Sequence, residues 1–465
     1  MLVVLLGTGC TTVPPAAEPP VSLPGGFSES GEASVPAAWW TVFKQDGLDR
    51  IIRMALAQNL DLQAARERLR AAQARARAVG ADRLPALDGD AALQWSSDAP
   101  DELQVNRWSA SLSVAYSVDF WGGIEAAIEA ERLRAEVARS EREAAGLLLA
   151  DAVARVWFQR LEARQRLDLL NEQLAVNGRI LDLLRVRFRG GQVAAVDVLR
   201  QEQLIQATRE ARAGVAEIAE LRDLKLDVLL GRNPQLPANG SVGAGTHPLP
   251  DLPPLPQTGL PAALVDRRPD IQAARFRIAV RNRETAKALS DRFPRLDLTA
   301  SFGSDGSSAD ELFRSWIQEA GGGLLVPLFD WGARKERVVA ARAGEEEALL
   351  AFGQAVLEAF REVEAALMGE RRQREQLAAV EAQIKLADQT YEQLRNRYAN
   401  GQIGYLDVLT ALTDVQQLRR EALVVRRHLL ETRIDLYTAI AGPLPERLDP
   451  VAADTATQPN PSYDD

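Results

Sequence analysis

The chain offers few side chains with the chemistry of an active site. Its 465 residues include two histidines, His247 and His428, which lie far apart in the sequence, and one cysteine, Cys10. Sites built from His and Cys take three or four ligands, so the usual metal sites of this kind are excluded. The sequence has no phosphate-binding motif of the G-x-x-x-x-G-K-S/T or G-x-G-x-x-G type. It therefore predicts a protein that is not an enzyme and needs no cofactor.

Two aspartates follow shortly after glycines at which a helix is expected to reverse direction. Asp197 follows Gly190-Gly191, and Asp407 follows Gly401. Such a carboxylate can cap the next helix or stabilise the positive end of its dipole.

The overall composition excludes two further classes of protein. Hydrophobic residues make up 46% and charged residues 26% of the chain, which is typical of a folded protein. No run of about 18 apolar residues follows the N-terminus, which excludes a helical membrane protein. A net charge of -10 argues against a nucleic-acid partner.

The single cysteine follows a short apolar run. Residues 2–6 are all Leu or Val, and three small residues separate them from Cys10. This order resembles a bacterial lipoprotein signal with its lipobox. The resemblance implies a signal peptide over 1–9 and acylation of Cys10, which then begins a lipidated tether over 10–45. The alternative is a buried or incidental cysteine.

An internal duplication organises the rest of the chain. Pro85 matches Pro294 at an offset of 209 residues, and Trp121-Gly122 matches Trp331-Gly332 at an offset of 210. An offset that stays nearly constant over such a distance indicates a tandem repeat. The two copies are predicted over 46–231 and 257–442, with a Pro-rich linker over 232–256 and a disordered tail over 443–465.

Each copy is predicted to contain two strands. Between Trp108 and Phe120 the apolar residues occupy every even position, whereas the odd positions are mostly serine. This period-2 alternation gives a strand with one apolar and one polar face. The predicted strands are 86–97, 107–120, 295–304 and 316–329.

Strands of this length suit a bilayer, which a tilted strand crosses in about 9–11 residues. Four strands cannot close a barrel, and open edges are not tolerated in hydrocarbon. Three copies would supply 12 strands, which lies within the range of outer-membrane barrels. The alternative is a set of soluble sandwich strands.

Long helices follow the strands in both copies. The stretches 124–189 and 333–399 contain no proline, and a helix of that length measures about 100 Å. Return helices are predicted up to 230 and over 405–441. Taken alone, these helices are typical of a coiled coil.

Four stretches resemble the TolC-like outer-membrane efflux family, in its OprM/NodT-like lipoprotein branch. They are Trp39-Trp40-Thr41-Val42-Phe43, Asn59-Leu60-Asp61-Leu62-Gln63-Ala64-Ala65, Arg267-Arg268-Pro269-Asp270-Ile271-Gln272-Ala273-Ala274 and Arg397-Tyr398-Ala399-Asn400-Gly401-Gln402.

The resemblance implies an α+β membrane protein. Three identical chains would form a homotrimer with a 12-stranded barrel in the outer membrane and a periplasmic tunnel of long antiparallel helices. It implies a passive duct for small amphiphilic compounds or drugs. The implied partners are a periplasmic adaptor, an inner-membrane pump of the resistance-nodulation-division (RND) type and outer-membrane lipid.

The resemblance also implies an iris-like gate at the two helix reversals. Asp407 would face the constriction, Leu406 would form an apolar ring, and Tyr398 would lie in the helix contacts. Asp197 is the repeat partner of Asp407. Arg397 suits the negative end of its helix, with a salt bridge across the tip as a second option.

Two tryptophans mark the passage from strand to helix. Trp121 and Trp331 are predicted to anchor the membrane interface, with plain packing as the alternative.

Two other functions remain open at this point. One is the exit duct of a type I protein-secretion system, and the other is a periplasmic coiled-coil lipoprotein without a channel.

Overall fold

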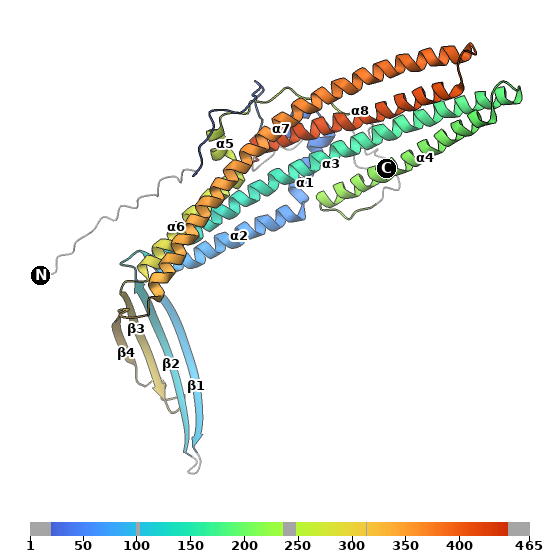
Figure 1. Ribbon diagram of the computed structural model, residues 1–465. Coiled ribbons are helices and arrows are strands. Elements are labelled where there is room, and N and C mark those ends of the chain that lie inside the picture. Colours follow the sequence, from blue (N-terminus) through green and yellow to red (C-terminus); the bar gives the residue numbers. More distant parts are fainter. Residues whose placement is uncertain (1–19, 99–102, 236–247, 313, 445–465) are drawn as a thin grey trace, which may run out of the picture. The chain divides into compact units, whose positions relative to one another are not determined.

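The computed structural model describes residues 20–98, 103–235, 248–312 and 314–444 (Figure 1). Cys10 and the predicted tail beyond residue 444 lie outside the described residues. The chain divides into two compact units. Of the described residues, the sheet unit contains 20–22, 65–141 and 270–356, and the helical unit contains 23–64, 142–269 and 357–444.

The sheet unit contains one antiparallel sheet with the order β1-β2-β3-β4, which confirms the four strands and the α+β class (Figure 1). The strands are β1 (Ala86–Asp98), β2 (Leu103–Val118), β3 (Arg295–Gly306) and β4 (Ile317–Leu325). β4 ends at Leu325, short of the expected 329, because Leu325 pairs with Arg295 at the very start of β3. Pro327 then lacks the N–H that a continued ladder would need.

The strand register separates two faces of the sheet. On one face Leu112 lies between Gly89 and Phe302, and on the other Ser113 lies between Asp88 and Ser301. The alternation predicted for β2 thus extends to its neighbours. On the polar face Ser117 Oγ donates to Asp297 Oδ1 at 2.6 Å.

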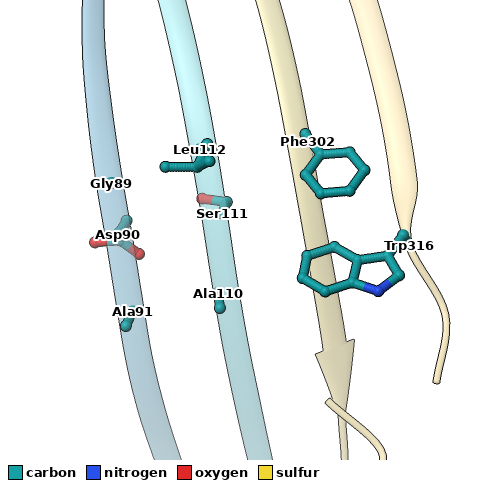
Figure 2. A pocket seen from close by; sticks show the side chains of 8 residues that line it. All are labelled: Gly89, Asp90, Ala91, Ala110, Ser111, Leu112, Phe302 and Trp316. Atoms are coloured by element: carbon teal, nitrogen blue, oxygen red, sulfur yellow. The ribbon is translucent and has the colours of Figure 1, made fainter. Parts of the chain in front are cut away.

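The apolar face presents large side chains to its surroundings. Figure 2 shows the Phe302 ring against the Trp316 indole, with centroids 4.6 Å apart and planes within 5°. With Leu112 and Gly89 these rings border a hollow of about 360 Å³. Because water solvates such a surface poorly, the apolar face requires a non-aqueous neighbour.

Each copy begins with two helices that are separated by a break. α1 (Asp46–Gln58) ends before Asn59, whose Oδ1 accepts from Leu62 N–H at 2.9 Å and so caps α2 (Leu60–Gly80). α5 (Pro261–Arg267) likewise ends before α6 (Pro269–Ser290), because proline disfavours helical geometry in the residue before it.

Four long helices make up most of the rest. They are α3 (Gly123–Arg189), α4 (Ala195–Leu229), α7 (Ala333–Ala399) and α8 (Tyr405–Ile440). α3 and α7 each have 67 residues. Within the described ranges, no helix has the length and apolar character needed to cross a bilayer.

The N-terminal segment, which was predicted to be a lipidated tether, packs against the rest of the helical unit from Gly31 onward. Gln257 N–H donates to Ala33 O at 2.8 Å, and Gly31 N–H donates to Pro256 O at 3.0 Å. Trp39 and Trp40, in a 3-10 helix over Trp39–Phe43, are buried in the core of the helical unit. Backbone pairing and tryptophan burial therefore fix a segment that has little regular structure.

Two ion pairs, one buried and one partly buried, join outgoing helices to return helices. Arg160 of α3 binds Asp223 of α4, and Arg433 of α8 binds Glu370 of α7 at 2.6 Å. A shift of 210 positions carries Arg160 onto Glu370 and Asp223 onto Arg433, so the two copies hold the same pair with opposite signs.

The Arg433 guanidinium also holds the linker. It donates to the carbonyl of Pro253 and, at 2.7 Å, to that of Pro254. Arg433 and Glu370 are 0% and 2% exposed. Removing Arg433 would therefore deprive a buried carboxylate of its buried partner, which costs far more than the loss of an exposed ion pair.

We expect Arg433→Met to lower the free energy of unfolding by about 3–5 kcal/mol, because Glu370 loses its buried ion-pair partner and two carbonyls lose their donor. Thermal and urea denaturation followed by circular dichroism measure this change. Arg374→Met is the matched control, since Arg374 binds the same Glu370 but is 47% exposed. Its loss should cost less than about 1 kcal/mol. Equal losses for the two variants would contradict the assignment.

Candidate functional site

The reversal between α7 and α8 is closed by backbone bonds around one glycine. Gly401 has φ +71°, which favours glycine. Its N–H donates to Tyr398 O at 3.0 Å, and Gln402 N–H donates to Arg397 O at 3.0 Å. These two bonds form a Schellman motif, which satisfies the last carbonyls of α7.

The reversal between α3 and α4 has the same construction. Gly191 has φ +70° and donates to Phe188 O at 2.9 Å, while Gln192 donates to Arg187 O at 2.9 Å. Both tips of the helical unit are therefore rigid turns of one design. Arg397 contributes its carbonyl to its turn, and its side chain is exposed.

The two predicted gate carboxylates lie in the first turns of the return helices. The N-cap positions are Ala194 and Gly404, so neither Asp197 nor Asp407 is the capping residue. The N-cap interpretation was therefore wrong, and stabilisation of the dipole from within the first turn fits the positions. Asp407 is exposed, and in the described chain no hydrogen bond or ion pair joins it to Asp197.

Other predicted gate residues differ in burial. Leu406 is 49% exposed beside Asp407. The ring of Tyr398 is covered by the Arg187 guanidinium, 5.3 Å from its centroid. The Tyr398 hydroxyl is buried without a hydrogen-bond partner among the described atoms. Within the described part of the chain, Tyr398 therefore contacts its neighbours through its ring and not through its hydroxyl.

A tyrosine that the sequence did not single out lies at the centre of the tip. Tyr405 is 4% exposed and packs in a small core with Leu184 and Val408. Its hydroxyl donates to Gln201 Oε1 at 2.5 Å, which joins α8 to α4. Burial raises the pKa of the Tyr405 phenol above its usual value, and nearby Tyr398, Tyr391 and Asp197 raise it further. The phenol therefore stays protonated and keeps donating.

The bond from Tyr405 begins a polar seam, which consists of Tyr405, Gln201, Asn177, Gln416 and Gln173. Gln201 Nε2 donates to Asn177 O at 2.8 Å, and Gln416 Nε2 donates to Asn177 Oδ1 at 2.8 Å. Gln173 Nε2 then donates to Gln416 O at 3.1 Å. The seam fixes α3, α4 and α8 against sliding, because a shift would leave buried amides without partners.

The only sequence signal for the seam was the placement of amides in an apolar stripe. Gln173 and Asn177 are four residues apart and lie between Leu170 and Leu181, on the stripe of α3. Amides at such positions indicate a buried polar network, but not its partners on other helices.

The two tryptophans at the strand-to-helix junctions, Trp121 and Trp331, differ in their contacts and in their exposure to solvent. Trp121 stacks on Phe293 with centroids 4.6 Å apart, and its Nε1–H donates to Pro294 O at 2.8 Å. Trp331 is 90% exposed and contacts Phe329 edge-on. Across the described residues, no group of three or more His, Cys, Asp or Glu side chains could hold a metal ion.

We expect Tyr405→Phe to destabilise the tip by about 1–3 kcal/mol, because Gln201 loses its buried donor. Hydrogen exchange of residues 398–412 measures this change. Tyr398→Phe is the control, since the hydroxyl it removes has no partner.

The wild-type tip should also lose stability as pH rises above about 10, the ordinary tyrosine pKa. A group whose pKa is raised by folding stabilises fully only below its unfolded value. The loss of tip stability at alkaline pH should be smaller in Tyr405→Phe than in the wild type. Equal behaviour of both tyrosine variants would contradict a role for the Tyr405 hydroxyl.

Comparison with known proteins agrees with this architecture. Pyoverdine export outer membrane protein OpmQ of Pseudomonas aeruginosa is 28% identical over 88% of this chain and 88% of its own length. Cation efflux system protein CusC of Escherichia coli is 26% identical over 95% of this chain and 98% of its own. The solved outer-membrane channel OprN superposes with a TM-score of 0.84 at 24% identity, covering 91% of this chain and 98% of that one.

The family model described as outer membrane efflux protein matches residues 51–232 and 260–442, which make up most of the chain. The chain therefore belongs to the outer membrane efflux protein family and is an outer-membrane transport protein.

Proposed function

We propose that three copies of this chain form a passive duct that exports small amphiphilic compounds across the periplasm and the outer membrane. The observation that carries the proposal is the two-faced sheet with two open edges. β1 and β4 are hydrogen-bonded on one side only, and their described side chains are exposed. Hydrocarbon does not tolerate open edges, so the apolar face can meet lipid only after closure with further copies.

Three copies supply the 12 strands of a closed barrel, with the serine-rich face toward water. The long helices would continue the duct as a tunnel. The helices satisfy their own backbone groups, so they can enclose water without further pairing.

The helix reversals suit a gate in this assembly. Asp407 and Leu406 are both exposed at the start of α8. Near a threefold axis, three Asp407 carboxylates would repel one another and attract cations, while three Leu406 side chains would hinder wetting. Asp197 and Arg397 would lie at the rim, and Tyr398 would hold the helices together.

The energy and the choice of cargo would come from partners, a periplasmic adaptor and an inner-membrane pump of the RND type. OpmQ and CusC carry names that refer to different cargoes, pyoverdine and a cation, at nearly equal identity to this chain. A wide water-filled duct selects weakly, which supports placing selection in the pump.

A lipid on Cys10 would fix the N-terminus to the same membrane. Pro20 lies against Gly353 of α7, where an added Cβ would meet Pro20 Cγ at 2.8 Å. Gly353 is 20 residues from Ala333, the first residue of α7, and therefore about 30 Å from the end of the helix that follows the strands. The ten residues from Cys10 to Pro20 reach about 33–36 Å, enough for the lipid to arrive there.

We expect the purified trimer to conduct in planar bilayers, and Asp407→Ala to raise the mean current about twofold or more while weakening the preference for cations. Asp414→Ala, at another exposed aspartate of α8, is the matched control. If no variant conducts under any condition, the duct is excluded and a coiled-coil lipoprotein is favoured. Unchanged current in Asp407→Ala would exclude only the gate role.

We expect mass spectrometry to find acyl groups on Cys10 at the mature N-terminus and to find none in Cys10→Ser. Thr11→Ala controls for changes beside the site. A free thiol on Cys10 in membrane-extracted wild-type protein would contradict the anchor.

A further inference from the structure

The two strand hairpins of the chain, β1–β2 and β3–β4, pair their strands in the same register. Ala86 of β1 pairs with Ala115 of β2, and Arg295 of β3 pairs with Leu325 of β4. The second pair is the first one shifted by the repeat offsets, 209 for the first strand and 210 for the second. The duplication therefore preserves each backbone partner across the hairpin.

Inside the chain the two hairpins meet where β2 pairs with β3, which we call the inner seam. Ser113 of β2 lies opposite Ser301 of β3 on the polar face. Beyond the end of β2, Trp121 stacks on Phe293 and bonds Pro294 O. The inner seam thus combines a strand ladder with the contact of Trp121 with Phe293 and Pro294, which we call the tryptophan latch.

We infer that β4 of one copy pairs with β1 of the next in the register of the inner seam, which would place Gly323 opposite Ala92 of the partner subunit. This inference rests on the trimeric duct proposed above. Gly323 is the repeat counterpart of Ser113, and Ala92 is that of Ser301. We call this junction between two copies the outer seam. Because the two hairpins are equivalent, the outer seam would have the same register as the inner seam.

The faces of the sheet agree with this register. Gly323 lies opposite Asp297 in the β3–β4 ladder, and Ala92 lies opposite Ser109 in the β1–β2 ladder, so both belong to the polar face. The next rung joins Leu324 to Ala91 of the partner subunit, both on the apolar face. A register shifted by one residue would instead bring apolar side chains to the polar side.

Trp331 completes the outer seam. It is the counterpart of Trp121, but in one chain it is 90% exposed, against 52% for Trp121. The counterparts of Phe293-Pro294 are Leu84-Pro85, and Leu84 is 69% exposed at the free edge. The seam would bring Trp331 onto Leu84 of the partner subunit.

The backbone at the second junction differs from that at the first. Trp331 has φ +57°, which is rare for a bulky residue, and Asp330 Oδ2 accepts from Arg334 N–H at 3.0 Å. The order Asp119-Phe120 before Trp121 becomes Phe329-Asp330 before Trp331. This arrangement leaves the indole uncovered within its own chain.

Cysteine pairs test the register in the full chain with Cys10→Ser, so that the introduced thiols are the only ones. Ala92→Cys with Gly323→Cys should give covalent dimers and trimers on mild oxidation, seen by denaturing electrophoresis. An added Cβ at Gly323 meets nothing within 4 Å, so the site accepts a side chain. Ser113→Cys with Ser301→Cys is the positive control, because it closes a bond within one chain at the observed inner seam.

Asp88→Cys with Gly323→Cys is the control for register. Asp88 shares the face of Ala92 but lies four residues away, about 13 Å along the strand. Its yield should be lower by about tenfold or more, since a disulfide needs Cα atoms within about 7 Å.

A higher yield from Asp88 than from Ala92 would overturn the register and leave the trimeric duct standing. If the control pair closes but no pair links two chains, both the seam and the trimer are excluded.

A double-mutant cycle tests the latch. Trp331→Ala and Leu84→Ala should each lower the temperature at which the trimer dissociates, and the double variant should lose less than the sum, because contacting residues are coupled. Trp121→Ala with Leu84→Ala should be additive. Additive losses for Trp331 and Leu84 would exclude their contact.

Discussion

A β-strand leaves half of its backbone hydrogen-bonding groups to a neighbour, whereas an α-helix satisfies its own. In this chain β2 and β3 have neighbours on both sides, and β1 and β4 have one each. The four-stranded sheet is therefore incomplete as a single copy, while the long helices are not. An incomplete sheet needs further strands at its edges, and the alternation of apolar and polar residues, clearest in β2 and β3, gives this sheet one apolar and one polar face. A sheet with one apolar face and two open edges is well suited to closing with further copies in lipid.

The helical unit is held by polar groups placed inside apolar stripes. The pairs Arg160–Asp223 and Glu370–Arg433 each join residues 63 positions apart, so they fix where a return helix lies along its outgoing helix. The polar seam from Tyr405 to Gln173 does the same nearer the tips. Such networks contribute little net stability, but any displacement leaves buried groups without partners. They thereby select one alignment of the helices.

Much of this architecture could be predicted from the sequence, because it follows from periodicity. The alternation around Leu112 gave the faces of β2, and the repeat of Gly191 at Gly401 gave both reversals. The break at Asn59 was missed, since a capping asparagine within a helical pattern looks like any polar residue. The bond from Tyr405 to Gln201 was missed because it joins helices through tertiary packing that one sequence does not reveal.

The opposite signs of these two ion pairs affect which return helix can pack against which outgoing helix in a duplicated chain. α3 and α7 descend from one helix, as do α4 and α8, so each outgoing helix meets two return helices of similar shape while the protein folds. If α3 took α8 in place of α4, Arg160 would face Arg433, and α7 with α4 would oppose Glu370 to Asp223. Two like charges would then be buried together, at a cost of several kcal/mol. The exchange of signs thus adds an electrostatic cost to an exchange of return helices, besides the short turns at Gly191 and Gly401 that already tie each return helix to its own outgoing helix.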